Sequence, residues 1–229
     1  GLPSLVPNEP ASSAVGFHAG SSQRVTIPNG SDLNATAGPW AKRTVQLWFR
    51  PTSVPAPGTT GLAATAGLWE EGAVARSLAI YLWRDPTKQS PEEAELVFNA
   101  IDNAADGPGS PFGPPANPAV FVQTTVKVGQ TYHLVAVFDG DSKGLTGSLV
   151  LYLNGTEVAR VGGVGQIYNH TGDIQIGRGN GLTHNNSNGD FGFFDGVIDE
   201  VSVFNQALTA ARVAQLFQFA QTLPTAPAV

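Results

Sequence analysis

Carboxylate side chains are the groups in this sequence that could do acid–base chemistry, and their spacing decides which reactions are open. Hydrolysis of a glycosidic bond needs two carboxylates about 5–10 Å apart across the sugar. Glu92, Glu93 and Glu95 come closest, but Pro91 precedes them and polar residues surround them, so we expect a loop rather than a catalytic strand. The four His residues are scattered, and the chain has no Cys and no G-x-S-x-G motif. The sequence therefore predicts that the protein is not an enzyme.

Short segments that combine aromatic, amide and acidic side chains are candidates for binding a sugar. The candidate residues are Trp69 and Glu70 at the end of one predicted strand, Asp102 and Asn103 after another, and His184, Asn185, Asn186 and Asp190 in the Gly/Asn-rich segment 179–195. Asn and Asp side chains hydrogen-bond hydroxyl groups, but they also form turns without any ligand. Because loops often carry function in β-sandwiches, we predict that these segments form a binding rim.

Asp199 and His133 both lie in runs that are otherwise made for burial. Asp199 occurs in GVIDEVSVF, where a carboxylate needs a compensating partner. Calcium is one such partner, since it takes about six to eight oxygen ligands from carboxylates and carbonyls. A surface salt bridge or a hydrogen-bonded cap is the alternative. For His133, in TYHLVAVF, we expect a core histidine satisfied by neighbouring backbone rather than a ligand or base.

The composition excludes several classes of partner. The net charge is −6 and no basic cluster is present, whereas nucleic acid requires a positive face. No apolar run approaches the ~20 residues needed to cross a membrane. Without Cys there are no disulfides and no thiol chemistry. A charged content of 13%, with 27 Gly and 17 Pro, is typical of many short strands joined by loops.

Strand-like runs rich in Val, Ile, Leu and aromatic residues recur at short spacing through the chain. They cover 14–18, 23–27, 44–50, 62–69, 77–83, 95–101, 119–126, 131–138, 147–153, 156–161, 173–177 and 196–204. Asn154-Gly155 between two of these runs is the preferred pair for a type I′ turn, because both central residues need positive φ. The sequence therefore predicts an antiparallel hairpin there.

The two ends of the chain differ from the rest. Thr209 is a good N-cap, and apolar residues recur after it at helical spacing until Pro224, which predicts one short helix. Residues 1–12 and 222–229 are Pro-rich and aperiodic, and we expect both to be linkers to other domains of a parent chain. One domain then covers residues 13–221.

An ordered set of motifs in the second half of the chain resembles the laminin-G-like family of concanavalin-A-like domains in bacterial extracellular proteins. The motifs are Tyr132-His133 on a strand, LYLNG at 151–155, Ile176-Gly177, and FDGVIDEVSVFNQALT at 194–209. The first half conforms with GFHAG and TVQLWFRP. Each motif alone is weak, but their order and spacing match over about residues 13–221.

The resemblance implies an all-β jelly-roll sandwich of two antiparallel sheets with one short C-terminal helix, which agrees with the strand runs above. It also implies a calcium ion with a structural role. In similar domains the residue equivalent to Asp199 binds calcium with backbone carbonyls near the start of the domain, here around Phe17 to Gly20. Related glucanases carry their catalytic acids as E-x-D-x-x-E or E-x-D-x-E on one strand, and this chain lacks that pattern.

The expected function is a non-catalytic carbohydrate-binding or adhesion module of a larger secreted or cell-surface protein of bacterial type, with calcium as an expected cofactor. Its partners would be a glycan or a cell-surface protein, without nucleic acid or membrane insertion. The first alternative is a structural spacer or protein–protein assembly domain with no small ligand, and the second is a glycoside hydrolase.

Overall fold

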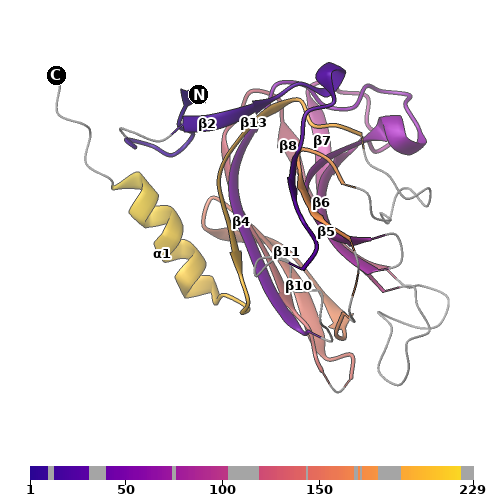
Figure 1. Cartoon of the computed structure of the whole chain (residues 1–229), viewed down its shortest axis with the longest axis vertical. Coiled ribbons are helices and arrows are strands. Elements are labelled where there is room, and N and C mark those ends of the chain that lie inside the picture. Colours follow the sequence, from indigo (N-terminus) through magenta and orange to yellow (C-terminus); the bar gives the residue numbers. More distant parts are fainter. Residues whose placement is uncertain are drawn as a thin grey trace.

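Two antiparallel sheets packed face to face make up the molecule (Figure 1). The computed structural model describes residues 1–9, 13–30, 40–73, 76–102, 119–142, 144–167, 170, 172–179 and 192–222. Helix α1 (Ala210–Gln221) lies on the outer side of one sheet, and the strands of both sheets bow toward it (Figure 1). The predicted fold class, an all-β sandwich with one short C-terminal helix, is confirmed.

The first sheet, called the large sheet below, has seven strands in the order β1-β2-β13-β4-β9-β10-β11. Their bounds are Leu2–Pro3 for β1, Ser13–Phe17 for β2, Gly196–Phe204 for β13, Lys42–Pro51 for β4, Tyr132–Asp139 for β9, Gly147–Leu153 for β10 and Thr156–Val164 for β11. The last strand of the chain, β13, lies between β2 and β4. The N-terminal strands and the last strand are therefore neighbours on one side of the large sheet.

The second sheet, called the small sheet, has six strands in the order β3-β12-β5-β6-β7-β8. Their bounds are Val25–Ile27 for β3, Ile174–Ile176 for β12, Thr65–Ala73 for β5, Arg76–Trp83 for β6, Glu93–Asp102 for β7 and Ala119–Lys127 for β8. Two short 3₁₀ helices, η1 (Ala19–Ser21) and η2 (Gly61–Ala64), lie in connections. From β5 to β8 each strand pairs with the next one along the chain.

The apolar core fills the space between the two sheets. On β4, Val45, Leu47 and Phe49 are at most 1% exposed and belong to this core. Trp48, between them, faces the other way and belongs to a separate cluster under α1. This alternation follows from the period of two along a strand. It gives each sheet one face toward the core and one outer face.

A buried ion pair joins the two sheets near one end of the sandwich. Arg43 of β4 donates from Nη2 to Oε1 of Glu71 of β5 at 2.5 Å, and their side chains are 3% and 0% exposed. The guanidinium also lies over the ring of Trp40, 4.8 Å from its centroid. Neutralisation by a partner is what makes such buried charges tolerable, because an unpaired one is very costly.

The β10–β11 connection forms the predicted hairpin. Asn154 and Gly155 have φ values of 51° and 78°, as a type I′ turn requires, and Leu153 pairs with Thr156. Gly155 has a second role, since a Cβ atom there would come within 3.1 Å of the Phe217 side chain on α1. The turn therefore fits closely against the helix.

The N-terminal segment, predicted from its composition to belong to a linker, packs on the sandwich over its described residues 1–9. Its strand β1 pairs with β2, and the side chains of Leu5 and Val6 are each 7% exposed. Both contact a cluster that includes Trp48 and Ala220 of α1. Residues 10–12 and 223–229, which complete the two predicted linkers, lie outside the described residues.

Candidate functional site

The outward side chains of the small sheet, called the polar face below, lie in register across its strands. One row runs through Gln175, Glu70, Ala79, Asn99 and Phe121, on β12, β5, β6, β7 and β8 in turn. Glu70 and Asn99 are 0% exposed and Phe121 is partly exposed. Glu70 and Asn99 thus form a buried polar layer, whereas the partly exposed Phe121 ring can pack on an apolar surface.

Further rows continue the polar face toward the β6–β7 connection. Tyr81 is followed across the sheet by Val97 and Gln123, and Trp83 by Glu95 and Thr125. Successive rows are two residues apart, or about 6.6 Å. Trp83 and Gln123 are partly exposed and Thr125 is exposed, so this end of the polar face is the more accessible one.

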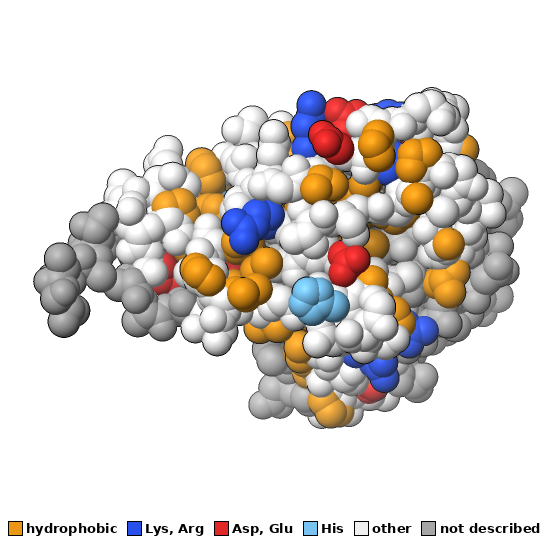
Figure 2. All heavy atoms as spheres, turned by 90° about the horizontal axis from the view of Figure 1, so that it is seen from above, with side chains coloured by type: hydrophobic (Ala, Val, Ile, Leu, Met, Phe, Trp, Pro, Cys, Tyr) orange, Lys and Arg blue, Asp and Glu red, His pale blue; other side chains and the backbone are white. Residues whose placement is uncertain are grey.

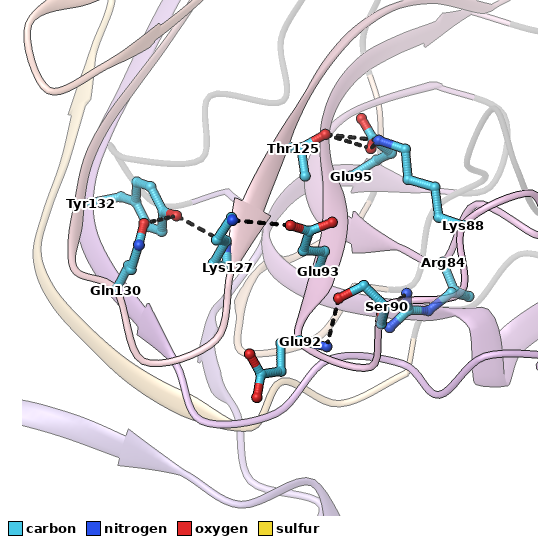
Figure 3. Close-up of polar contacts among 10 residues, drawn as sticks. All are labelled: Arg84, Lys88, Ser90, Glu92, Glu93, Glu95, Thr125, Lys127, Gln130 and Tyr132. Atoms are coloured by element: carbon cyan, nitrogen blue, oxygen red, sulfur yellow. Dashed lines mark hydrogen bonds and ion pairs between the residues drawn. The ribbon is translucent and has the colours of Figure 1, made fainter.

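Two Glu–Lys pairs lie at this accessible end (Figure 3). Lys88 and Thr125 both donate to Oε1 of Glu95, the hydroxyl at 2.9 Å, and the side chain of Glu95 is 4% exposed. Lys127 Nζ lies 3.1 Å from Oε1 of Glu93. Both acids are outward positions at the start of β7. The strand predicted at 95–101 already included Glu95, whereas Glu93 was expected in a loop, and for Glu93 this is wrong. Each carboxylate thus already has an ammonium partner.

The connections next to these pairs are held by buried polar side chains. Arg84, 1% exposed, donates from Nε to the Pro55 carbonyl at 2.6 Å and from Nη1 to the Ser90 carbonyl at 2.7 Å. The Tyr132 hydroxyl accepts from the Lys127 backbone N–H at 2.9 Å and donates to Gln130 at 2.8 Å (Figure 3). Burial raises the pKa of Tyr132. These contacts give the accessible end of the polar face a rigid frame.

The chain passes close to Gly67 of β5 twice after β12, once at Arg178 and again at Gly192. A Cβ atom on Gly67 of β5 would come within 2.7 Å of the Arg178 backbone, so the chain crosses β5 closely there. On its return, the Gly192 carbonyl accepts a hydrogen bond of 2.9 Å from Gly67 N–H. The four candidates between these points, His184, Asn185, Asn186 and Asp190, lie outside the described residues.

The other predicted rim residues are spread over different parts of the small sheet. Trp69 is 1% exposed and points into the core, where it cannot meet a ligand on the outer face. Glu70, next to it, is in the middle of the polar face. Asp102 is the last residue of β7, opposite Arg76, and Asn103 lies outside the described residues. The structure therefore brings Glu70 to the polar face and leaves Trp69 out of it.

Asp199 holds the N-terminal segment against the large sheet. Its Oδ2 accepts hydrogen bonds from Ser4 Oγ and Leu5 N–H, both at 2.8 Å, and Oδ1 accepts one from Glu200 N–H at 3.0 Å. Ser4 Oγ also lies 2.7 Å from Glu9 Oε2, but its single proton serves one carboxylate at a time. These partners are N–H and O–H donors, the hydrogen-bonded alternative raised by the sequence, and they do not fit a cation at Oδ2.

The Phe17–Gly20 segment, expected to supply carbonyl ligands, is bonded to a different acid. Asp195 Oδ1 accepts from Ala19 N–H at 2.9 Å, and its Oδ2 accepts from Ser53 Oγ at 3.0 Å. Phe17 and Asp199 do border the same open cavity of about 340 Å³. No group of three or more His, Cys, Asp or Glu side chains that could hold a metal ion is found in the described ranges. The calcium site remains a prediction.

The surface seen from above carries charge only in small groups (Figure 2). Blue and red side chains lie next to each other at the upper edge, and the others are scattered among apolar and uncharged side chains. Nothing on the described part of this face resembles the broad positive surface that nucleic acid requires. None of the described helices is long and apolar enough to cross a lipid bilayer.

The fold and the order of its motifs agree with one protein family. A laminin G-like family model, described as the concanavalin A-like lectin/glucanases superfamily, matches residues 19–214. The chain belongs to this family. The resemblance inferred from the NG hairpin and the IDEV strand is thereby confirmed. No match is found among curated proteins.

Several solved binding domains of toxins share the fold at low sequence identity. The binding domain of Paraclostridial mosquitocidal protein 1 is 13% identical, with a TM-score of 0.59, covering 92% of this chain and 44% of that one. For the botulinum neurotoxin serotype G binding domain the values are 12%, 0.52, 93% and 46%. A structure of botulinum neurotoxin type C, whose cell entry depends on two ganglioside molecules, gives 10%, 0.53, 86% and 40%. The chain spans less than half of each, and the likeness shows the fold.

Most residues of the polar face were not identified from the sequence. Trp83, Gln123, Thr125 and Asn99 were not among the candidate binding residues. Their signal was weak, because each is one polar or aromatic residue in an alternating strand. Only the register between strands, set by tertiary structure, shows that they share one face.

Proposed function

We propose that the chain is a non-catalytic carbohydrate-binding or adhesion module of a larger secreted or cell-surface protein. Its ligand would lie on the polar face, over the partly exposed side chains Trp83, Gln123 and Phe121, which extend from the accessible end to the row of Glu70 and Asn99. The observation that carries this proposal is the register that places these side chains beside the row of Glu70 and Asn99. The family to which the chain belongs also includes lectins, which supports the same conclusion.

The chemistry of the polar face suits a sugar. A pyranose ring has an apolar face, which packs on an aromatic ring, and hydroxyl groups around its edge, which exchange hydrogen bonds with amides and carboxylates. Trp83 and Phe121 supply aromatic surface, and Gln123 and Thr125 supply polar groups on the same face of the sheet. The buried Glu70 and Asn99 make the floor polar.

The arrangement of the acids supports a binding role over hydrolysis. A glycosidase needs one carboxyl group as general acid and a second as base or nucleophile, both facing the scissile bond. Glu93 and Glu95 are close enough on β7, but each is engaged by a lysine, and Glu95 also accepts from Thr125. Because these carboxylates serve as ion-pair partners, we propose that the domain releases no sugar.

A glycan array compares the wild type with Trp83→Ala and Phe121→Ala. We expect the wild type to bind a subset of glycans and both variants to lose at least tenfold in affinity, because the aromatic contact is removed. Phe219→Ala is the matched control, since this 68% exposed ring is on α1, on the other side of the sandwich. Equal binding by all four proteins would contradict the location, and no binding by the wild type would contradict the function.

Calcium is tested in the same experiment. The array is repeated after chelation and with added Ca²⁺, and the melting temperature is measured in both states. Loss of glycan binding or a lower melting temperature after chelation would support the prediction that the domain binds calcium. A chain that binds no glycan in either state and forms a stable dimer would favour the assembly role instead.

A further inference from the structure

We propose that the domain contains an acid-sensitive catch, in which protonation of His133 under α1 releases the C-terminal half of this helix from the large sheet. The catch lies on the outer face of the large sheet, called the covered face below, away from the proposed glycan site. The inference is independent of the proposed function. It rests on the packing around one imidazole ring.

His133 is enclosed by aromatic rings. Its side chain lies on β9 with a residue exposure of 1%, and its ring centroid is 5.0 Å from that of Trp48 on β4. Phe217 of α1 also stacks on it, with centroids 5.7 Å apart and ring planes 22° apart. Phe217 also stacks on Trp48 at 6.0 Å. The helix thus closes the imidazole off from water.

The ring nitrogens of His133 are unpartnered in the part of the chain that the structure describes. Asn154 Oδ1 accepts from the backbone N–H of His133 at 2.9 Å, but neither Nδ1 nor Nε2 has a hydrogen-bond partner. From the sequence we expected a core histidine hydrogen-bonded to neighbouring backbone. The residue is in the interior, but its ring has no such hydrogen bond. An imidazolium has two N–H donors and a charge, so its burial here is far more costly than that of the neutral ring.

No neighbouring charge offsets this cost. On β4 and β13 the nearest acid is Asp199, which pairs with Trp48 and is bonded to the N-terminal segment, while the cation Arg50 lies further along β4. On β11, Glu157 is bonded to Arg160 at 2.7 Å, and Tyr152 of β10 is uncharged because burial raises its pKa. The only charged residue of α1 is Arg212. Burial alone lowers the pKa of His133 to about 4.

The two halves of α1 are held differently. Its start is pinned by Thr44 of β4, whose hydroxyl donates to the Gln206 carbonyl at 2.7 Å and accepts from Leu208 N–H at 3.1 Å. Val213 then packs on an aliphatic cluster of β9 and β10. The second half, with Phe217 and Ala220, covers His133, Trp48 and the N-terminal segment.

Protonation therefore acts on the second half of the helix. Lifting Phe217 hydrates the imidazolium without opening the core between the sheets, which makes it the least costly way to admit the proton. A helix of twelve residues has little stability once it leaves its packing surface. The released turns should then unwind, while the start of α1 stays bonded to β4.

Hydrogen exchange measured residue by residue tests the catch on the full chain, at about pH 7.5 and about pH 5. With a pKa of about 4 when covered and 6.5 when free, the opening constant of residues 214–221 should rise about 30-fold, beyond the intrinsic change in exchange chemistry. Amides of β4 and β9 should keep their protection. His133→Phe, which retains an aromatic ring without a titrating group, should abolish the rise, and His18→Gln, at an exposed histidine, should retain it.

A second measurement covers the case in which His133→Phe does not fold. Phe217→Ala uncovers the imidazole, so an NMR titration should find the pKa of His133 closer to 6.5 than in the wild type. The catch is overturned if α1 and β9 lose protection together at acid pH, if His133→Phe responds like the wild type, or if His133 titrates near 6.5 while α1 remains protected.

Discussion

The two outer faces of the sandwich belong to sheets of similar size but have opposite characters. The covered face, on the large sheet, is apolar and aromatic, and α1 and the N-terminal segment lie over it. The polar face, on the small sheet, carries amides, carboxylates and partly exposed aromatic rings. This difference agrees with our proposal that one side of the sandwich serves stability and the other serves recognition.

Curvature gives a physical reason for this division. The strands bow toward α1, so the large sheet presents its convex side to the helix and the small sheet presents a concave side outward (Figure 1). A concave surface surrounds a ligand on several sides and lets polar groups from different strands converge on it. A convex apolar surface needs a cover, which the two ends of the chain supply.

The contrast between the faces is tested most strongly by replacing one tryptophan on each. Trp48→Ala, on the covered face and 4% exposed, should lower the free energy of unfolding by about 3–5 kcal/mol through the cavity that it leaves. Trp83→Ala, partly exposed on the polar face, should cost about 1 kcal/mol. Urea denaturation measures both. Similar losses of stability in the two variants would contradict the proposal that the covered face contributes more to stability than the polar face.

The covered face should also make stability depend on pH. Because burial lowers the pKa of His133 from 6.5 to about 4, the folded chain binds fewer protons than the unfolded chain between these values. Stability is therefore complete above pH 6.5 and falls as the pH drops toward 4. The pKa difference corresponds to a loss of up to about 3 kcal/mol in the free energy of unfolding. If releasing α1 costs less free energy than this, the loss is limited to the cost of that release.

Denaturation curves at about pH 7.5 and about pH 4.5 measure this loss in the wild type and in His133→Phe. We expect the variant to lose clearly less stability on acidification than the wild type. An equal loss in both proteins would assign the pH dependence to other groups.

The attachment of the N-terminal segment should depend on one carboxylate. Asp199→Ala leaves the buried N–H of Leu5 without its acceptor, and an unsatisfied buried donor costs about 1–3 kcal/mol. Limited proteolysis should then cleave within residues 1–9 faster than in the wild type. Glu200→Ala, which changes the neighbouring exposed acid, is the control. If chelation of divalent ions accelerates cleavage of the wild type to the same extent, Asp199 holds a cation after all.

The smallest expected effect concerns the start of α1. Thr209 Oγ1 accepts a hydrogen bond of 3.3 Å from Arg212 N–H, and loss of such a cap costs about 1 kcal/mol. Thr209→Ala should lower stability by this amount, and Thr209→Ser should restore most of it. Glycan binding at the polar face should not change in either variant. A change in binding would mean that the two faces are coupled.

Local chemistry made much of the fold predictable. Asn154 and Gly155 form the hairpin because these residues accept positive φ, and Thr209 begins the helix because its hydroxyl caps a free N–H. Alternation of Val45, Leu47 and Phe49 marked the core face of β4. The composition of residues 1–9, by contrast, suggested a linker. Composition could not show that Leu5 N–H donates to Asp199, which is 194 positions away in the chain.

The sequence by itself determined most of the strands, where one turn and one helix form, and that the family is laminin G-like. These depend on interactions among near neighbours or on motif order. The sequence missed β1 and assigned residues 62–64, which belong to η2, to a strand. Only the tertiary structure decided that Trp69 is in the core while Glu70 shares a face with Asn99, because sheet register joins residues far apart in the chain. It also decided that His133 is enclosed by Trp48 and Phe217 with its ring nitrogens unpaired. No local pattern could reveal that, since burial and pairing belong to the packed molecule.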